Sequence, residues 1–276
     1  MAPGEESQSQ ESQILQAQLT AGQAALRRSA TGLIISAFSG GLDLGFSLFL
    51  SAAVLTVLPG SDWSLLQRLL VGGAYAVGFI LVVIGRSELF TEQTTLAVLP
   101  VLHGISGIGR LARLWGIVWV GNVVAEAVFA VIAVIVGPAL GAIDPAAFDA
   151  IAQRTLAPDW WVIILSAALA GWLMGMLSWL GAATDDTLAR MAIVVVITAS
   201  IGFLGLHHSI VGTSEVLAGV LAGGNATMAD FARFLALATF GNAVGGTFFV
   251  AVLKYGHAVR PGQKEEVEVP GDGPGS

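Results

Sequence analysis

The sequence contains no cysteine and few charged residues. Of its 276 residues, 11% are Asp, Glu, Lys or Arg, whereas ordinary soluble domains carry about 25%. The absence of cysteine excludes disulfide scaffolds, Cys-bound zinc, iron–sulfur clusters and thiol catalysis. The shortage of charge argues against a disordered chain, a nucleic-acid-binding protein and most soluble enzymes.

Long apolar stretches are abundant instead, and 55% of the residues are hydrophobic. A bilayer core of about 30 Å needs about 20 mostly apolar residues per helix. Six stretches qualify: 31–58, 68–102, 113–137, 160–183, 189–222 and 231–257. The pattern predicts an all-α membrane protein whose six transmembrane helices lie in one domain, residues 31–257. The second and fifth stretches are longer and carry polar residues near their middles.

The two ends of the chain differ in composition from this domain. Residues 1–30 contain no long apolar run, so a signal peptide is not expected. Four apolar residues recur there at helical spacing: Ile14, Leu15, Leu19 and Leu26. They favour an amphipathic helix on the membrane face, but Gly22 weakens that helix, and a solvated tail is an equal alternative. Residues 258–276, with Pro, Gly and Glu, are expected to be disordered.

Basic residues in the short loops predict the orientation in the cell (inner) membrane. With six spans and both termini cytoplasmic, the cytoplasmic side holds Arg27, Arg28, Arg110, Arg113, Arg190, Lys254, Arg260 and Lys264. The opposite side holds Arg68, Arg154 and Arg233. This bias favours cytoplasmic termini, because positive charge accumulates on that side.

A repeat is visible in the spacing of polar motifs. Gly121-Asn122 in the third stretch and Gly241-Asn242 in the sixth are 120 residues apart. The same offset sets residues 87–91 over residues 207–211. Three spans per repeat is an odd number, so the second copy enters the membrane inverted. We therefore predict two inverted three-helix repeats with helices two and five broken, a design that places a transport path at the repeat interface.

The polar groups at the two predicted breaks include histidine and threonine. Thr91, or a neighbouring threonine, is expected to cap the second half of the broken helix. His208 is the candidate pore residue, because imidazole titrates near neutrality and ionisable groups inside membranes mark substrate or proton paths. A structural imidazole that bonds to a neighbouring carbonyl is the alternative, and it is the better interpretation for His207.

Several charged residues fall within the predicted spans. Arg86 lies at membrane depth and needs a partner; the candidates are Asp43, Glu126, Glu88 and Glu92. Arg86 has two alternative roles: it forms a buried structural ion pair, or it attracts an anion directly. Glu215 is equally ambiguous.

Taken together, these motifs resemble the formate/nitrite transporter family. The resemblance rests on Leu89-Phe90-Thr91 after an acidic residue, His208-Ser209-Ile210 after Gly205, and the paired Gly-Asn motifs. It covers about residues 30–257. It implies an aquaporin-like inverted-repeat fold, a homopentamer with one pore per subunit, and passage of small monovalent anions such as formate or nitrite, as the anion or the protonated acid.

The resemblance also assigns expected pore residues. His208 matches the central pore histidine, Thr91 the loop threonine that faces it, and Glu88 the acidic residue that opens the loop motif. Tyr75 and Phe79 match one apolar constriction and Ile201 part of the other. Ser209 belongs to the histidine motif. The chain is a divergent member, because Glu92 and Gln93 follow Thr91, and Gly171 replaces a polar residue common in the family.

Three other functions are alternatives to anion transport. A neutral-solute channel suits an arginine at depth, but the two Asn-Pro-Ala boxes of aquaporins are absent. A cation or small organic-solute carrier is favoured by the intramembrane acids Asp43, Glu88, Glu92, Glu126 and Glu215. An intramembrane enzyme is disfavoured, because no catalytic motif appears. No cofactor, metal or nucleic-acid partner is expected; the expected partners are a small anion and the lipid bilayer.

Overall fold

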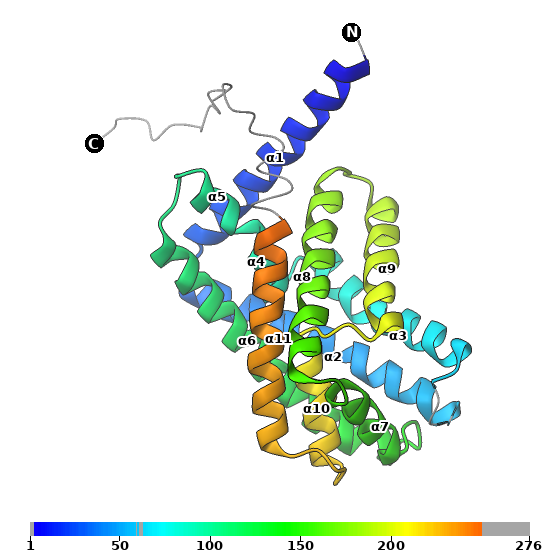
Figure 1. The fold of residues 1–276 in the computed structure, drawn as a ribbon. Helices are drawn as coiled ribbons and strands as arrows, with labels where there is room; N and C mark the ends of the chain where they lie inside the picture. Colours follow the sequence, from blue (N-terminus) through cyan, green and yellow to red (C-terminus); the bar gives the residue numbers. More distant parts are fainter. Residues whose placement is uncertain (1–2, 59, 61–62, 250–276) are drawn as a thin grey trace.

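The computed structural model describes residues 3–58, 60 and 63–249, without the side chains of residues 3–10. All regular secondary structure in these ranges is helical (Figure 1). The helices are α1 (Pro3–Arg27), α2 (Ala30–Val57), α3 (Leu65–Gly85), α4 (Phe90–Leu96), α5 (Val98–Leu102), α6 (Ile108–Ala139), α7 (Pro145–Leu156), α8 (Trp160–Ala182), α9 (Thr187–Leu204), α10 (Val211–Leu221) and α11 (Met228–Phe248). The expected tail 258–276 lies outside the described residues.

Five of these helices are long and apolar enough to cross a membrane. They are α2, α3, α6, α8 and α9. The sequence predicted six spans. The sixth predicted stretch, 231–257, coincides with α11 up to Phe248 and then continues beyond the described residues. Helix α10 is apolar but has only 11 residues.

Each of the two long predicted stretches contains more than one helix. Residues 68–102 contain most of α3 together with α4 and α5, and residues 189–222 contain α9 and α10. Helix α3 ends at Gly85 and α4 begins at Phe90. Helix α9 ends at Leu204 and α10 begins at Val211. We call the two intervening segments, 86–89 and 205–210, the first and second junctions.

Several helices begin with a side-chain cap, but the two helices that follow the junctions do not. Ser64 and Gln67 form a capping box at the start of α3, and Asp186 accepts the N–H of Ala189 at the start of α9. Helices α4 and α10, which follow the junctions, begin without a side-chain cap. The backbone groups at the junctions must therefore find partners elsewhere in the protein.

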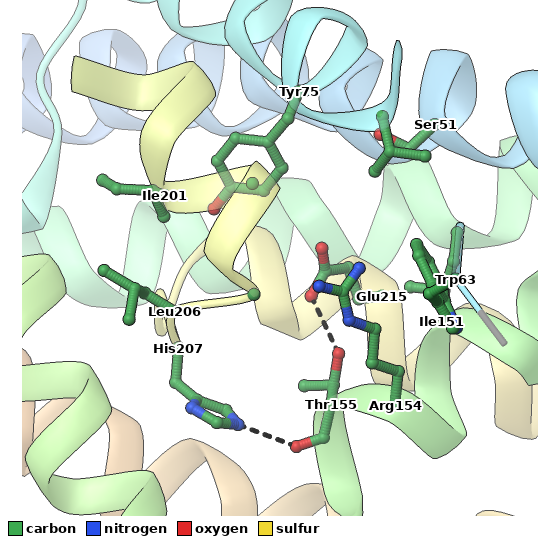
Figure 2. A pocket seen from close by; sticks show the side chains of 13 residues that line it. Ser51, Trp63, Tyr75, Ile151, Arg154, Thr155, Ile201, Leu206, His207 and Glu215 are labelled. Atoms are coloured by element: carbon green, nitrogen blue, oxygen red, sulfur yellow. Dashed lines mark hydrogen bonds between the residues drawn. The ribbon is translucent and has the colours of Figure 1, made fainter. Parts of the chain in front are cut away.

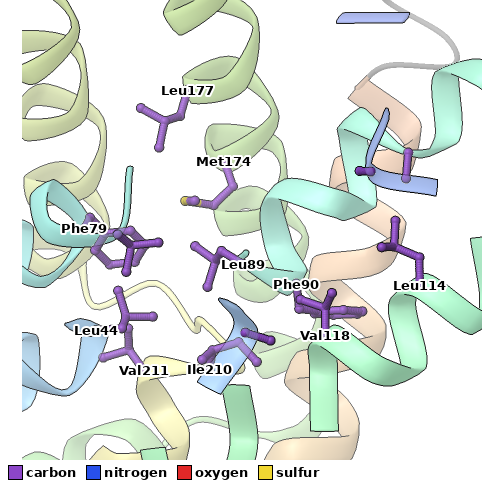
Figure 3. Close-up of a cluster of buried hydrophobic side chains, with 14 of the residues drawn as sticks. Leu44, Phe79, Leu89, Phe90, Leu114, Val118, Met174, Leu177, Ile210 and Val211 are labelled. Atoms are coloured by element: carbon purple, nitrogen blue, oxygen red, sulfur yellow. The ribbon is translucent and has the colours of Figure 1, made fainter. Parts of the chain in front are cut away.

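Small residues allow two helix pairs to approach closely. Helix α2 packs along α6, and α8 packs along α11. A Cβ atom on Gly41 of α2 would lie 2.7 Å from the carbonyl oxygen of Asn122 on α6. A Cβ atom on Gly171 of α8 would collide with the carbonyl oxygen of Asn242 on α11. Between these pairs, Leu44, Phe79, Leu89, Met174, Val211 and their neighbours form the central core (Figure 3).

Helix α1 packs on protein at one end of the molecule, beside α5 (Figure 1). Leu15 and Leu19 are buried in a cluster with Leu99 and Trp179. The amide of Gln18 donates to the carbonyl oxygen of Ser178 at 2.8 Å, and the Ser178 hydroxyl donates back to it. Gly22, which weakened the predicted helix, lies where α1 contacts the carbonyl oxygen of Leu96. A Cβ atom on Gly22 would collide with that oxygen.

The outward faces of the long helices are apolar. On α6 the exposed residues include Val120, Val124, Val128, Val131 and Ile135, and on α8 they include Trp160, Trp161, Leu165 and Leu169. Contiguous apolar surface of this kind is rare on soluble monomers and marks an interaction with lipid or protein. Together with the five apolar helices, it identifies a multi-pass membrane protein.

Candidate functional site

The two junctions start in the same unusual backbone conformation. Arg86 follows α3 with φ 56°, and Gly205 follows α9 with φ 67°, both in the left-handed region. Glycine adopts this conformation without steric cost, whereas a side chain such as that of Arg86 adopts it rarely. Each residue ends its helix, and the residues that follow in each junction, such as Leu89 and Ser209, are buried in the protein.

Asn122 of α6 holds the first junction in place. Its side-chain oxygen accepts the backbone N–H of Phe90 at 2.8 Å, and its amide nitrogen donates to the carbonyl oxygens of Ala37 and Glu88 at 2.7 and 2.9 Å. Asn122 is completely buried. The Asn122 carboxamide therefore satisfies the N–H of Phe90 and the carbonyl oxygen of Glu88 at the junction. Each of these backbone groups would cost about 1–3 kcal/mol if it were left unpaired.

Asn242 of α11 does the same for the second junction. Its oxygen accepts the N–H of Ser209 at 2.8 Å, and its nitrogen donates to the carbonyl oxygens of Ala167 and His207 at 2.8 and 3.0 Å. The similarity between the two junctions extends to the serine that precedes Ala37 on α2 and the serine that precedes Ala167 on α8. The hydroxyl of Ser36 accepts the N–H of Glu88, and that of Ser166 accepts the N–H of His207.

These matched contacts correct the predicted register. Glu88 and His207 occupy equivalent places 119 positions apart, as do Phe90 and Ser209, whereas the two asparagines are 120 apart. The sequence alignment had set Glu88 over His208, which is wrong by one residue. Ser36-Ala37 and Ser166-Ala167, which are 130 positions apart, complete the pattern. This third pair is not evident from the sequence, because serine and alanine are too common in apolar helices to stand out.

His208 and Thr91 meet between the two junctions. Nε2 of His208 lies 2.8 Å from the Thr91 hydroxyl oxygen, and both side chains are buried. The backbone N–H of Val211 donates to Nδ1 at 3.3 Å, so Nδ1 acts as an acceptor. In a neutral imidazole the proton is then on Nε2, which donates to Thr91. Thr91 keeps its own hydroxyl proton for another acceptor.

Thr91 was also a candidate helix cap, and that prediction is wrong. Helix α4 starts at Phe90, its N-cap residue Leu89 makes no side-chain cap bond, and Thr91 lies inside the helix. The N–H of Phe90 goes to Asn122 instead. Tertiary contacts thus replace the local cap and leave the Thr91 side chain to face the histidine.

The aromatic rings of Tyr75 and Phe79 form a row that ends at His208. The ring of Phe79 contacts the His208 ring edge-on with a centroid distance of 5.2 Å, and Tyr75 lies 5.3 Å from Phe79. Tyr75 and Ile201 line one cavity, although the resemblance had assigned them to opposite constrictions. Tyr75 therefore lies between the cavity and the Phe79–His208 contact.

This cavity has a volume of about 40 Å³ (Figure 2). A water molecule needs about 10–15 Å³ on this measure, so the space holds more than one. Arg154 of α7 lines the cavity, and its guanidinium stacks 3.9 Å from the ring centre of Trp63. Burial and the nearby Arg68 lower the pKa of Arg154, while Glu215 acts in the opposite direction; an arginine nevertheless stays charged.

The cavity wall also holds Glu215 and His207. The hydroxyl of Thr155 donates to the Glu215 carboxylate at 3.2 Å (Figure 2). His207 is hydrogen-bonded at both ring nitrogens, to the Ser166 hydroxyl at 2.8 Å and to the Thr155 carbonyl oxygen at 2.9 Å. A carbonyl can only accept, so Nε2 of His207 carries a proton. These contacts match the structural interpretation of His207.

Glu88 pairs with Arg28 and not with Arg86. The Arg28 guanidinium donates to one carboxylate oxygen of Glu88 at 2.5 Å, and the Gln93 amide donates to the other at 2.5 Å. Arg86 is exposed and makes no ion pair with any described residue. The expected partners of Arg86 were therefore wrong, because its left-handed backbone directs the chain inward while the side chain stays at the surface.

The remaining acidic candidates lie in separate places. Asp43 accepts a hydrogen bond from the Ser87 hydroxyl at 3.3 Å, and Glu92 is half-buried on α4. Glu126 is fully buried on α6. The hydroxyl of Ser209 is buried without a hydrogen-bond partner among the described residues. The described ranges also contain no group of three or more His, Cys, Asp or Glu side chains arranged to hold a metal ion.

Arg154, Trp63, Ser36 and Ser166 are the site residues that the sequence analysis missed. Arg154 was counted only as a loop charge. Its place in the cavity depends on the packing of α7 against α10, and no local pattern indicated that contact.

Apolar membrane helices that are interrupted where buried polar side chains meet are typical of transport and channel proteins. The chain belongs to the formate/nitrite transporter family, since the family model described as formate/nitrite transporter matches residues 12–256.

Named relatives and solved structures agree with this placement. The inner membrane protein YfdC of Escherichia coli is 32% identical over 85% of this chain and 74% of its own length. The nitrite transporter NirC of Salmonella typhimurium is 27% identical over 80% of this chain and 81% of its own length. An FNT family ion channel superposes with a TM-score of 0.78 at 22% identity, over 90% of this chain and 99% of that one. A pentameric formate channel with formate bound gives a TM-score of 0.67 at 22% identity, over 82% and 96%.

Proposed function

We propose that this protein carries small monovalent anions of weak acids, such as formate or nitrite, across the membrane past His208 and Thr91. The observation that carries this proposal is the buried 2.8 Å contact between their side chains, formed between the two helix junctions. At that point an anion would meet a proton on His208 Nε2 and a hydroxyl proton on Thr91. Both donors sit among apolar side chains, where hydrogen bonds to an ion are stronger than in water.

The architecture that fits this path has six crossings in two inverted repeats, as in aquaporins. In this interpretation α3 and α4 form one broken crossing and α9 and α10 another. The first repeat then contains α2, α3–α4 and α6, and the second contains α8, α9–α10 and α11. The paired asparagine and serine contacts support this architecture. In the first repeat α2 and α6 hold the junction, and in the second repeat α8 and α11 hold the equivalent junction. Broken helices at the midplane are typical of transport paths.

A proton link would use the His208 imidazole. His208 would first take up a second proton and become an imidazolium, and it would then pass one proton to the anion and return to its neutral form. The anion becomes a neutral acid, which crosses apolar constrictions at lower cost. Phe79 and Tyr75 would form such a constriction on the cavity side. Arg154 would attract the anion into the cavity, with Glu215 opposing it.

The acidic residues favour a second candidate, a cation or small organic-solute carrier. Asp43, Glu92, Glu126 and Glu215 all lie on membrane helices or junction-flanking helices, and only Arg154 opposes them in the cavity. A neutral-solute channel on the same scaffold is the third. Reversal potentials in asymmetric salt separate anion from cation selectivity, and shrinkage of vesicles in glycerol detects a neutral-solute pore.

Orientation and assembly follow the same reasoning. Arg27, Arg28 and Arg113 lie at the α1 end of the molecule, and Arg68 and Arg154 lie toward the α7 end. The positive-inside rule then puts the α1 end and both termini in the cytoplasm. The exposed apolar faces suit a homopentamer in lipid, and the formate channel whose fold is similar is pentameric.

A flux panel tests the proposed function. Purified protein in proteoliposomes would be challenged with formate, nitrite, acetate, lactate, hydrosulfide and a cation at two pH values. The proposal predicts transport of the small anions, faster at the lower pH, and no cation current. A current that reverses at the cation equilibrium potential would replace it with the second candidate.

A further inference from the structure

Glu126, on α6, is the most completely buried acid in the described part of the chain. Its exposed fraction is 0%, and neither carboxyl oxygen has a hydrogen-bond partner among the described residues. The same helix carries Asn122 one turn earlier, where every polar atom of the carboxamide is used. Glu126 is therefore not part of the junction contacts, and its burial needs a separate explanation.

An isolated carboxylate cannot stay charged in such a place at reasonable cost. Removing an ion from water without a partner costs many kcal/mol, and the group takes up a proton instead. No described cation pairs with Glu126. Ionisable groups inside membrane proteins are rare and mark ion or proton paths.

The neighbourhood of Glu126 connects it to the cavity. Its carboxyl lies close to the Ser214 hydroxyl and within electrostatic range of Glu215, the next residue on α10. Tyr75 on α3 lies within electrostatic range of both acids. Glu215 and Tyr75 line the cavity, whereas Glu126 does not. Charged or titratable residues on the other elements packed against α6 include Asp43 on α2, Glu92 on α4, Arg154 and Asp149 on α7, and Glu11 and Arg27 on α1.

The available space favours a proton over a metal cation. A cation of the alkali or alkaline-earth type needs about six or more oxygen ligands in a shell around it. Glu126 does not line the cavity that holds Glu215, and the described ranges contain no group of three or more His, Cys, Asp or Glu side chains arranged to hold a metal ion. A proton needs neither space nor a ligand shell.

We propose that Glu126 is a buried proton-binding site that exchanges its proton with the cavity by way of Glu215. One proton moves from cavity water to the Glu215 carboxylate and from there to Glu126, and it returns by the same route. The linkage of this proton to anion flux rests on the proposed function, but the binding site itself does not. The site exists in one half of the protein, because Gly246 takes the equivalent place 120 residues later and packs against the Thr94 hydroxyl instead.

Infrared difference spectroscopy tests the site without requiring transport. Spectra of the reconstituted protein would be recorded across a pH range for wild type, Glu126→Gln and the matched control Glu11→Gln on α1. We expect a protonated-carboxyl band in wild type and in the control, with one component lost in Glu126→Gln. Identical bands in all three proteins, or a band that disappears when sodium replaces choline in the buffer, would overturn the proposal.

A second variant and a flux measurement complete the test. Should Glu126→Gln not fold, Glu215→Gln takes its place, and it is expected to shift the pH at which the Glu126 component changes; no shift would contradict the exchange route. In formate-loaded proteoliposomes, Glu126→Gln is expected to lose part of the pH dependence of flux that Glu11→Gln retains. Unchanged pH dependence would refute the linkage, whereas absence of wild-type flux would refute the proposed function and leave the infrared result to decide the site.

Discussion

Arg28 precedes α2 and donates to the carboxylate of Glu88 in the first junction, with 2.5 Å between nitrogen and oxygen. The arginine side chain is 41% exposed and the glutamate side chain 9% exposed. Arg28, in the link between α1 and α2, therefore supplies the positive charge that pairs with the mostly buried carboxylate of Glu88. This contact ties the helix at the end of the molecule to the segment that carries Thr91.

Replacing Arg28 with Gln should destabilise the protein modestly. Glu88 would keep the Gln93 hydrogen bond but lose its countercharge, and because Arg28 is partly exposed we expect a loss on the order of 1 kcal/mol. Thermal unfolding in detergent measures it. Arg27→Gln, at the exposed neighbouring position, is the control and should leave the melting temperature unchanged. Equal melting temperatures for both variants would mean that the ion pair contributes nothing.

Asn122→Ala and Asn242→Ala should each be strongly destabilising. Each substitution removes three buried hydrogen bonds and leaves junction groups unpaired, at about 1–3 kcal/mol per group. The expected result is loss of folded protein in size-exclusion chromatography or a large fall in melting temperature. Gln153→Ala, at an exposed position on α7, should have no such effect. Two wild-type-like asparagine variants would show that the junctions hold without these contacts.

Gly171→Ala should disrupt the packing of α8 on α11. The added methyl group would collide with the Asn242 backbone, which cannot move away without moving the second junction. Gly116→Ala on α6 is the matched control, because nothing lies within 4 Å of its added Cβ, and alanine stabilises a helix interior by roughly 0.5–1 kcal/mol over glycine. We expect a lower melting temperature for Gly171→Ala and an equal or higher one for Gly116→Ala. The reverse order would contradict the close approach of the two helices.

Arg154→Gln should slow anion flux while leaving the fold intact. The guanidinium is the cationic group that lines the cavity, beside Glu215. Its loss removes the attraction for an incoming anion, so flux should fall several-fold and become less sensitive to ionic strength. Stopped-flow flux at low and high salt measures both effects. Arg233→Gln is the control, since Arg233 lies on α11 away from the cavity lining; equal slowing in the two variants would indicate a general surface effect.

The sequence predicted the helical class and the positions of the polar interruptions, because both follow from local patterns. A run of apolar residues long enough to cross a bilayer as a helix can be recognised from the sequence alone. The polar residues that interrupt 68–102 and 189–222 coincide with the junctions. His208 and Thr91 were named together through the family resemblance, and their contact distance is 2.8 Å.

What the sequence could not give are the contacts between distant elements. The partner of Glu88 is Arg28, 60 positions away, and Arg86 nearby in the chain points outward. Equivalent junction residues are 119 positions apart, whereas the two asparagines are 120 apart. The sequence did not reveal this difference, because an ungapped alignment assumes equal loop lengths. The cavity residue Arg154 depends on how α7 packs against α10. These outcomes are decided by tertiary geometry, which neither spacing nor composition encodes.

The central claim, that His208 and Thr91 act together on a passing anion, is tested most directly by a double-mutant cycle on formate flux. Flux would be measured in proteoliposomes across a pH range for wild type, His208→Asn, Thr91→Val and the double variant. Two groups that serve one anion are not independent. We therefore predict that each single variant loses most of the flux or its rise at low pH, and that the double variant is little worse than either. Flux that is unchanged in all three variants at every pH would contradict the account.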